Sequence, residues 1–292
     1  MDMNLLKYLA FVKTAEYGSF TRASEILNYS QSGISRMIAD LEDDCGFTLL
    51  ERCRGGVRLT PDGERILPFA KNLCNEYNNL QMQVDELKGV QSGLIRIGTF
   101  SSVATHWLPK IISAFQKDYP GIDYELLLGD YTEIEDWILE GRVDCGFLRT
   151  PTHKEFDTIP IGQDRLMAIL PQGHPLAGLD KVPLSEMCNE PFMLLEKGAQ
   201  AEIAALFERN HLKPQVRFTT WDDYAVMSMV ESGLGISILP ELILKRIPYN
   251  IVIRELDVPA YRNIAFCLRD KKSASLAVKR FMNYLDYKDS AD

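Results

Sequence analysis

Residues 29–42, Tyr-Ser-Gln-Ser-Gly-Ile-Ser-Arg-Met-Ile-Ala-Asp-Leu-Glu, place small hydroxyls, an amide and a guanidinium beside an apolar helical face. Ser30 can cap this helix, and Gly46 lies beyond its end. The apolar members recur at helical spacing: Ile34, Met37, Ile38 and Leu41. Polar side chains at the start of such a helix suit contact with base edges in the major groove of DNA.

Each polar side chain of this helix start has a chemistry that fits DNA. Gln31 can pair with an adenine edge, and Arg36 can reach a guanine edge or a phosphate. Ser32 and Ser35 can reach a phosphate or a base. Ser30 fits either a plain N-cap or a cap that also contacts phosphate, because helix N-termini favour anions.

The elements around this helix predict a helix-turn-helix followed by a hairpin within the first 60 residues. A helix runs up to Gly18, and Ser19 can cap a short helix that ends near Asn28, about three residues before the next one. Two β-like runs around Gly55-Gly56 predict a hairpin. We expect contacts with the DNA backbone from Thr21 and Arg22 at the start of the short helix. On the hairpin, Arg52, Arg54 and Arg58 suit either the flanking DNA backbone or the minor groove.

Residues 61–90 predict a long helix that pairs with a second copy of the chain. Thr60-Pro61 is a strong helix start, since a capping hydroxyl precedes a proline at the first helical position. Apolar residues then follow at alternating steps of four and three: Ile66, Ala70, Leu73, Tyr77, Leu80, Val84 and Leu87. This heptad spacing indicates a dimer. The alternative is a single helix packed on its own domain.

From Gly93 onward, strand-like runs alternate with amphipathic helices, which predicts a parallel α/β sheet of βαβ units. The strand-like runs are 94–98, 124–128, 143–148, 166–170, 192–195, 216–219, 235–239 and 263–268. The whole chain therefore reads as an α+β multidomain protein.

Motifs in both halves resemble LysR-type transcriptional regulators. The N-terminal ones are Phe20-Thr-Arg-Ala-Ser-Glu-Ile-Leu, Ser30-Gln-Ser-Gly-Ile-Ser-Arg, Leu50-Glu51-Arg52 and Arg58-Leu59-Thr60-Pro61-Asp62-Gly63. The C-terminal ones are Tyr119-Pro120, Gly141-Arg-Val-Asp144, His174-Pro175-Leu176 and Gly233-Leu-Gly-Ile-Ser-Ile-Leu-Pro240. Gly33 departs from the family pattern, in which alanine or another better helix former usually stands.

The resemblance implies a winged helix-turn-helix, a dimerising linker helix and a two-lobed α/β effector domain like the periplasmic solute-binding proteins. It places lobe one at 91–160 plus 264–292 and lobe two at 161–263. It implies a sequence-specific regulator that binds a pseudo-palindromic promoter site in double-stranded DNA, as a homodimer and usually a homotetramer. A small-molecule effector binds between the lobes, and RNA polymerase is a further expected partner.

Effector residues are expected at strand ends and helix starts that face the space between the lobes. Arg149 follows the third strand, where some relatives that respond to aromatic acids place a ligand-binding arginine, so we expect a small organic anion. Asp130 opposes that expectation. Ser101 or Ser102 can instead only cap its helix, and Trp221 can instead pack at the hinge. The predicted effector residues are Thr99, Phe100, Ser101, Ser102, Asp130, Thr132, Phe147, Arg149, Glu196 and Trp221.

Composition excludes several other classes. The net charge of -9 argues against sequence-blind DNA binding, which depends on neutralising phosphates. The N-terminus lacks a secretory signal and no apolar run is long enough for a membrane helix, so we expect a cytoplasmic protein. Four isolated histidines and six scattered cysteines offer no metal site, and we expect no cofactor.

Two rival functions are weaker. A redox-responsive regulator of the same family needs a reactive thiol beside a resolving one, and Cys145, Cys188 and Cys267 are far apart in the sequence. A bilobal enzyme needs a catalytic motif, and the chain has no nucleophile elbow, P-loop or His-Glu-x-x-His. A transport receptor would need an export signal. We therefore expect a regulator and not an enzyme.

Overall fold

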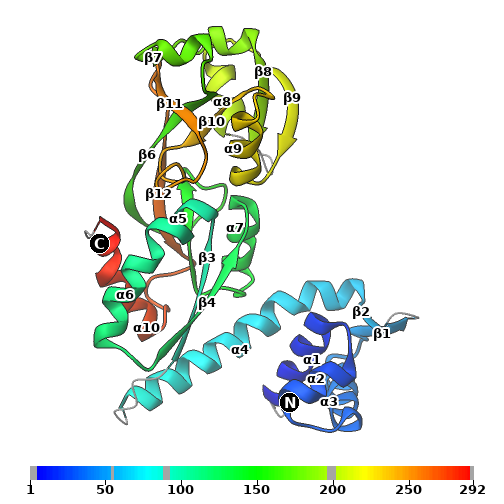
Figure 1. Ribbon diagram of the computed structural model, residues 1–292. Helices are drawn as coiled ribbons and strands as arrows, with labels where there is room; N and C mark the ends of the chain where they lie inside the picture. Colours follow the sequence, from blue (N-terminus) through cyan, green and yellow to red (C-terminus); the bar gives the residue numbers. More distant parts are fainter. Residues whose placement is uncertain (1–4, 54–55, 88–92, 196–201, 290–292) are drawn as a thin grey trace. The chain divides into compact units, whose positions relative to one another are not determined.

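The computed structural model describes residues 5–53, 56–87, 93–195 and 202–289. The chain divides into two compact units, Met1–Ser92 with Leu139–Val143, and Gly93–Ile138 with Asp144–Asp292 (Figure 1). Within the described ranges, no helix is both long and apolar enough to cross a membrane.

The first unit begins with the three helices that the sequence predicts, α1 (Leu5–Tyr17), α2 (Phe20–Leu27) and α3 (Gln31–Cys45). The Ser19 hydroxyl accepts the Arg22 N–H, and the Ser30 hydroxyl accepts the Gly33 N–H at 3.1 Å, so both predicted caps are confirmed. Gly46 ends α3 in the left-handed conformation. The apolar faces bury a common core that includes Phe11, Ala23, Ile34, Ile38 and Leu41.

A two-stranded antiparallel wing, β1 (Leu50–Cys53) and β2 (Gly56–Leu59), follows the helices. One Glu42 carboxylate oxygen accepts the backbone N–H groups of Leu49 and Leu50 at 2.7 and 3.0 Å, which ties the end of α3 to the start of the wing. The Val57 N–H donates to the Gly18 carbonyl at 2.9 Å, and a Cβ at Gly56 would lie 2.4 Å from that oxygen. The wing therefore needs glycine at this crossing.

Helix α4 (Pro61–Leu87) starts where Thr60 predicts it, because the Thr60 hydroxyl accepts the Gly63 N–H at 2.9 Å. The residues of the predicted heptad seam differ in exposure along the helix. Ala70 is buried in the core of the N-terminal unit, whereas Tyr77 and Leu80 are 45% and 56% exposed. The last seam position, Leu87, has no described side chain.

The second unit starts with β3 (Gly93–Thr99), α5 (Ser101–His106), α6 (Leu108–Asp118), β4 (Ile122–Leu128), α7 (Tyr131–Leu139) and β5 (Cys145–Thr150). The chain then runs through β6 (Asp157–Pro171), η1 (Pro175–Gly178), β7 (Lys181–Val182), η2 (Glu186–Asn189), β8 (Pro191–Leu195), α8 (Glu202–Arg209), β9 (Gln215–Thr220), α9 (Asp223–Glu231), β10 (Ile236–Pro240) and β11 (Ile251–Leu256). It returns in β12 (Tyr261–Leu268) and ends in α10 (Leu276–Phe281) and η3 (Met282–Asp289).

These elements form two lobes, as expected, but the sheet is mixed and not parallel. The strand order is β4-β3-β5-β12-β6-β10-β8-β9, with β11 beside β6 and β7. Parallel βαβ pairs occupy the two ends, whereas β6 and β12 pair antiparallel with each other and with their neighbours. The reason is that β6 leaves lobe one and β12 returns to it, so the two connecting strands must run in opposite directions (Figure 1).

Separate hydrophobic clusters fill the two lobes. One includes Phe115, Phe147 and Phe266, and lies in the lobe built by β3–β5, α5–α7 and α10. Two others surround Phe192 and Met227 in the lobe built by β7–β11, α8 and α9. The predicted crossing points near residues 160 and 264 lie inside the continuous strands β6 and β12. The cleft between the two lobes therefore lies at these strands.

Candidate functional site

The start of α3 presents a polar surface. The side chains of Ser30, Gln31, Ser32 and Arg36 are exposed, and Ser35 is half-buried. Ile34 and Ile38, on the opposite face, are buried. The amphipathic pattern thus leaves the predicted base-contacting side chains free of the core, and their contacts with DNA stay predictions.

Two arginines of the wing are among the residues predicted to contact the DNA backbone. Arg52 on β1 donates to the Ser35 hydroxyl at 3.4 Å, and its guanidinium lies 5.2 Å from the centre of the Phe20 ring. Arg58 on β2 pairs with Glu51 at 2.6 Å across the wing. Arg52 is therefore held by a hydrogen bond to α3 and a cation–π contact with α2.

Thr21, Arg22 and Arg54 are the remaining residues predicted to contact DNA. Thr21 is exposed, and the exposed Arg22 pairs with Glu25 at 3.0 Å on the same helix. Arg54 lies outside the described residues. Exposed ion pairs of this kind contribute little to stability, so Arg22 can exchange its partner for a phosphate at small cost.

A cavity of about 290 Å³ lies between the lobes of the second unit. Its walls come from the starts of α5, α7, α8 and α9 and from β12. The lining residues are Phe100, Ser101, Ser102, Leu128, Gly129, Asp130, Tyr131, Leu166, Leu195, Glu202, Ile203, Trp221, Asp223, Pro240 and Arg262. We call this the first cavity.

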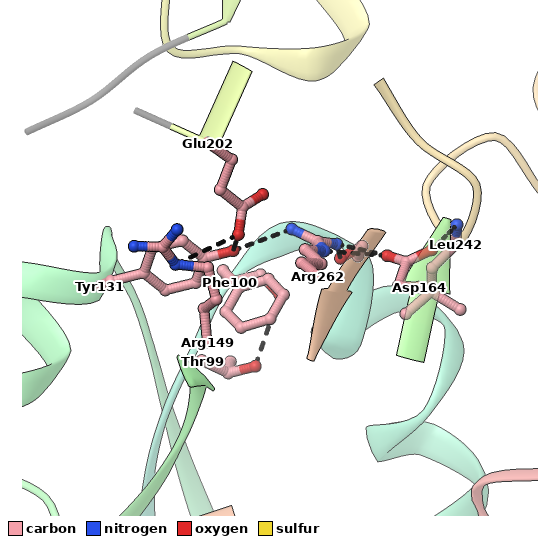
Figure 2. A network of polar contacts seen from close by, with 9 residues as sticks. Thr99, Phe100, Tyr131, Arg149, Asp164, Glu202, Leu242 and Arg262 are labelled. Carbon is pink, nitrogen blue, oxygen red and sulfur yellow. Dashed lines mark hydrogen bonds and ion pairs between the residues drawn. The ribbon is translucent and has the colours of Figure 1, made fainter. Parts of the chain in front are cut away.

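Arg262 is the buried centre of its polar wall (Figure 2). Its Nε and Nη2 donate to the Asp164 carboxylate at 3.0 and 2.7 Å, and Nη2 also donates to the Ser102 hydroxyl at 2.7 Å. Nη1 donates to the Tyr131 hydroxyl at 2.9 Å. The guanidinium lies 5.0 Å from the centre of the Phe100 ring. One residue of β12 thereby ties together α5, α7 and β6.

Glu202, the first residue of α8, reaches from the second lobe to the first. Its carboxylate accepts the Tyr131 hydroxyl at 3.3 Å and forms an ion pair with Arg149 at 3.4 Å (Figure 2). Burial raises the pKa of the Glu202 carboxyl above its usual value, and the nearby Arg262 and Arg149 oppose that rise. These contacts join the two lobes in the structure.

Two further carboxylates line the first cavity in different ways. Asp130 caps α7: its Oδ1 accepts the Glu133 N–H at 2.7 Å, and the Glu133 carboxylate accepts the Asp130 N–H at 2.9 Å. Asp223 is not used as a cap, because Asp222 accepts the first N–H groups of α9. Burial raises the pKa of the Asp223 carboxyl to about 6.

A second cavity of about 450 Å³ adjoins the first, and the two share Leu166, Glu202 and Arg262 in their walls. Arg149 and Arg209 also line it. Among the described residues, the charged lining of the second cavity therefore consists of three arginines and one glutamate. The described lining of the first cavity, by contrast, has three carboxylates and one arginine.

The predicted effector residues are only partly brought together. Phe100, Ser101, Ser102, Asp130 and Trp221 line the first cavity, and Trp221 is 69% exposed. Arg149 instead lines the second cavity.

Four of the predicted effector residues do not line either cavity or lie outside the described residues. Phe147 is fully buried and packs against Phe266 in the core, because β5 is an inner strand covered on both faces. Thr99 is fully buried and its hydroxyl donates to the Phe100 carbonyl, and Thr132 is exposed outside both cavities. Glu196 lies outside the described residues.

Sequence reasoning missed Asp164, Glu202, Asp223 and Arg262 as site residues. For Asp164 and Arg262, the sequence signal was a charged residue inside an otherwise apolar strand. In the structure the two residues are paired across β6 and β12. Glu202 and Asp223 stand at helix starts, where a carboxylate ordinarily serves the helix itself.

The cysteines of the effector domain are not poised for redox chemistry. Cys145 and Cys267 are fully buried, and burial raises the pKa of both thiols, to about 12 for Cys267. Burial also raises the pKa of Cys188. Thiols that stay protonated are poor nucleophiles. No group of three or more metal-ligating residues occurs within the described ranges.

Both units of the chain match known protein families. The profile "Bacterial regulatory helix-turn-helix protein, lysR family" matches residues 5–64, and "LysR substrate binding domain" matches residues 88–288. The chain is 33% identical over 289 residues to the probable HTH-type transcriptional regulator LrrA of Synechococcus elongatus, covering 97% of this chain and 96% of that one. It is 31% identical over 283 residues to the HTH-type transcriptional regulator YvbU of Bacillus subtilis, covering 96% and 97%.

Solved structures of similar fold include full-length regulators. A full-length OxyR variant from Pseudomonas aeruginosa has a TM-score of 0.80 at 20% identity, covering 100% of this chain and 96% of that one. Full-length CbnR in complex with its target DNA has a TM-score of 0.70 at 22% identity, covering 98% and 100%. At these identities the likeness shows the fold alone.

The two profile matches together span most of the chain, and the relatives of known class are transcriptional regulators and not enzymes. The chain belongs to the LysR family of DNA-binding transcriptional regulators, with a helix-turn-helix unit and an effector-binding domain.

Proposed function

We propose that this regulator reads a pseudo-palindromic DNA site through the start of α3 and that a small molecule bound between its lobes controls transcription. The observation that carries the proposal is the exposed polar start of α3, with Arg52 of the wing bonded to Ser35 beside it. Gln31 and Arg36 supply base recognition, and Ser30, Ser32 and Arg52 position the helix on the backbone.

Selection of DNA from a random library by the full chain tests the reading of DNA. We expect two related half-sites separated by whole turns of the double helix. Gln31→Ala and Arg36→Ala should each weaken binding to the selected site by about tenfold or more, and should relax selection at one base position. Arg217→Ala, which changes an exposed arginine on β9 in the effector domain, is the matched control. Unchanged affinity in both α3 variants would refute the proposed contacts.

A second copy of the chain is the proposed partner of α4. The exposed Tyr77 and Leu80 on its heptad seam support this, since isolated exposed apolar side chains at seam spacing favour a partner helix. Leu80→Glu should shift the chain from dimer to monomer in analytical ultracentrifugation, and Gln81→Glu beside it should not. Association into tetramers would add a second interface that Leu80→Glu leaves intact.

The proposed effector is a small organic anion, and the second cavity is its site. Arg149, Arg209 and Arg262 give this cavity a basic lining. The anion would compete with Glu202 for Arg149, so Glu202→Gln should tighten it. With benzoate as the probe, we expect calorimetric binding to the full chain that Arg149→Ala removes. Benzoate binding that survives Arg149→Ala would refute this site.

A further inference from the structure

Among the described residues, the lining of the first cavity holds more carboxylates than guanidinium groups. Asp130, Glu202 and Asp223 line it together with Arg262. The Arg262 guanidinium is paired with the buried carboxylate of Asp164, and it only partly opposes the rise that burial causes in the pKa of Glu202 and of Asp223.

Arg262 offers little to an incoming anion. All three of its nitrogen atoms already donate to protein acceptors, namely Asp164, Ser102 and the Tyr131 hydroxyl. These bonds use four of the five N–H groups of the guanidinium, so an anion could take only one Nη1 N–H without breaking a bond, and it would share the cavity with the Asp223 carboxylate. A cation would face neither restriction.

Asp223 is the carboxylate with capacity to spare. Glu202 is engaged by Tyr131 and Arg149, and Asp130 is engaged by the Glu133 N–H. No other described residue donates a hydrogen bond to the Asp223 side chain. Burial raises the pKa of the Asp223 carboxyl to about 6, and the nearby Arg262 only partly opposes this rise, so the surrounding protein compensates the ionised form poorly.

The aromatic lining offers one free face. The Phe100 ring has the Arg262 guanidinium at 5.0 Å from its centre, and the Tyr131 ring has Arg149 at 5.8 Å. Trp221, two residues before Asp223, has no cation over its ring among the described residues. Indole is the aromatic surface to which cations bind best.

A metal ion does not fit this arrangement. No group of three or more acidic, histidine or cysteine side chains within the described ranges is close enough to hold one. The cavity volume of about 290 Å³ suits an organic molecule. The cation must therefore be carried by a small organic ligand.

We propose that the first cavity binds a small ligand bearing a protonated amine, whose ammonium group lies between the Asp223 carboxylate and the Trp221 ring. This inference rests on the proposed function, since it assigns a ligand class to the effector cleft. It assigns that class to the first cavity, whereas the proposed anion occupies the second.

Three probes of one shape test the proposal: benzylamine, benzyl alcohol and benzoate, titrated calorimetrically into the full chain at equal ionic strength. We expect benzylamine to enter the first cavity with higher affinity than benzyl alcohol. Asp223→Asn should weaken benzylamine about tenfold or more, because a charge-assisted hydrogen bond is lost. Trp221→Leu should weaken it less.

The matched control is Asp180→Asn, which removes one exposed carboxylate between η1 and β7 and leaves the cavity lining unchanged. It should leave benzylamine affinity unaltered, which separates a local contact from general attraction to an acidic protein. Absent benzylamine binding, or equal affinity in Asp223→Asn and wild type, would overturn the proposal. Benzoate binding that depends on Arg149, and DNA binding that depends on Gln31, test the proposed function separately from this outcome.

Discussion

Replacing Asp223 with asparagine should stabilise the ligand-free effector domain at neutral pH. Burial raises the pKa of the Asp223 carboxyl from 3.8 to about 6, so the folded chain holds an ionised group that unfolding relieves. A rise of this size corresponds to about 3 kcal/mol well above pH 6. Asparagine forgoes about 0.3–1 kcal/mol of favourable interaction between a carboxylate and the start of α9. We expect a net gain of roughly 2 kcal/mol.

The pH dependence has a definite sign. Between pH 3.8 and about 6, the folded chain keeps the Asp223 proton that the unfolded chain has released, so this group lowers stability progressively as the pH rises. With these two pKa values the penalty is about 1.6 kcal/mol at pH 5 and about 3 kcal/mol at pH 7.5. The advantage of Asp223→Asn over wild type should therefore grow by about 1.4 kcal/mol between these two pH values.

Urea unfolding of the full chain, followed by tryptophan fluorescence, measures this effect. Trp107, Trp137 and Trp221 are the three tryptophans of the chain and all belong to the second unit, so the signal reports the effector domain. Asp180→Asn is again the control for charge. A gain no larger than that of Asp180→Asn, or one that is equal at pH 5 and pH 7.5, would refute the burial argument.

Three further predictions concern contacts on which the two units depend. Glu42→Ala removes the acceptor of two backbone N–H groups and should lower the free energy of unfolding of the N-terminal unit by about 2 kcal/mol. Glu42→Gln keeps an acceptor and should lower it less. Circular dichroism during urea unfolding measures both variants. Arg262→Leu leaves the buried Asp164 carboxylate without its partner and should cost about 3–5 kcal/mol in the tryptophan-monitored transition, part of which Asp164→Asn in the same chain should restore. The thiols of Cys145 and Cys267 should react with a disulfide reagent only after denaturation, and rapid reaction in the native protein would return the redox-responsive alternative.

The DNA-binding unit was predictable because its signals are local. Ser19, Ser30 and Thr60 each bond to an N–H group within three residues along the chain, so hydroxyl positions and apolar spacing fixed the helix starts in advance. The N–H groups of Leu49 and Leu50 donate to the Glu42 carboxylate, only seven and eight residues away along the chain. These bonds nevertheless depend on how the wing folds back onto α3. Local chemistry thus predicted the elements, and the tie between them needed the structure.

The effector site was predicted less well because its contacts are long-range. Arg262 bonds to Asp164, 98 residues away in the sequence, and to Ser102, 160 residues away. Helical or strand periodicity cannot predict contacts between residues so far apart in the sequence. Arg149 was expected just after the third strand and lies within β5, and the sequence does not reveal that Glu202 pairs with it. Phe147 was placed wrongly, because an inner strand buries both of its faces and alternation then says nothing about exposure.

The position of Glu202 makes the two cavities energetically dependent on each other. Its carboxylate lines both, and it is held by Arg149 on the side of the second cavity. An anion that takes Arg149 leaves Glu202 less neutralised and so raises the negative potential in the first cavity, where it favours an amine. Linkage requires the amine to favour the anion by the same factor. Since Glu202 belongs to α8 and its partners Tyr131 and Arg149 belong to the opposite lobe, the same exchange would also change the contacts that join the two lobes.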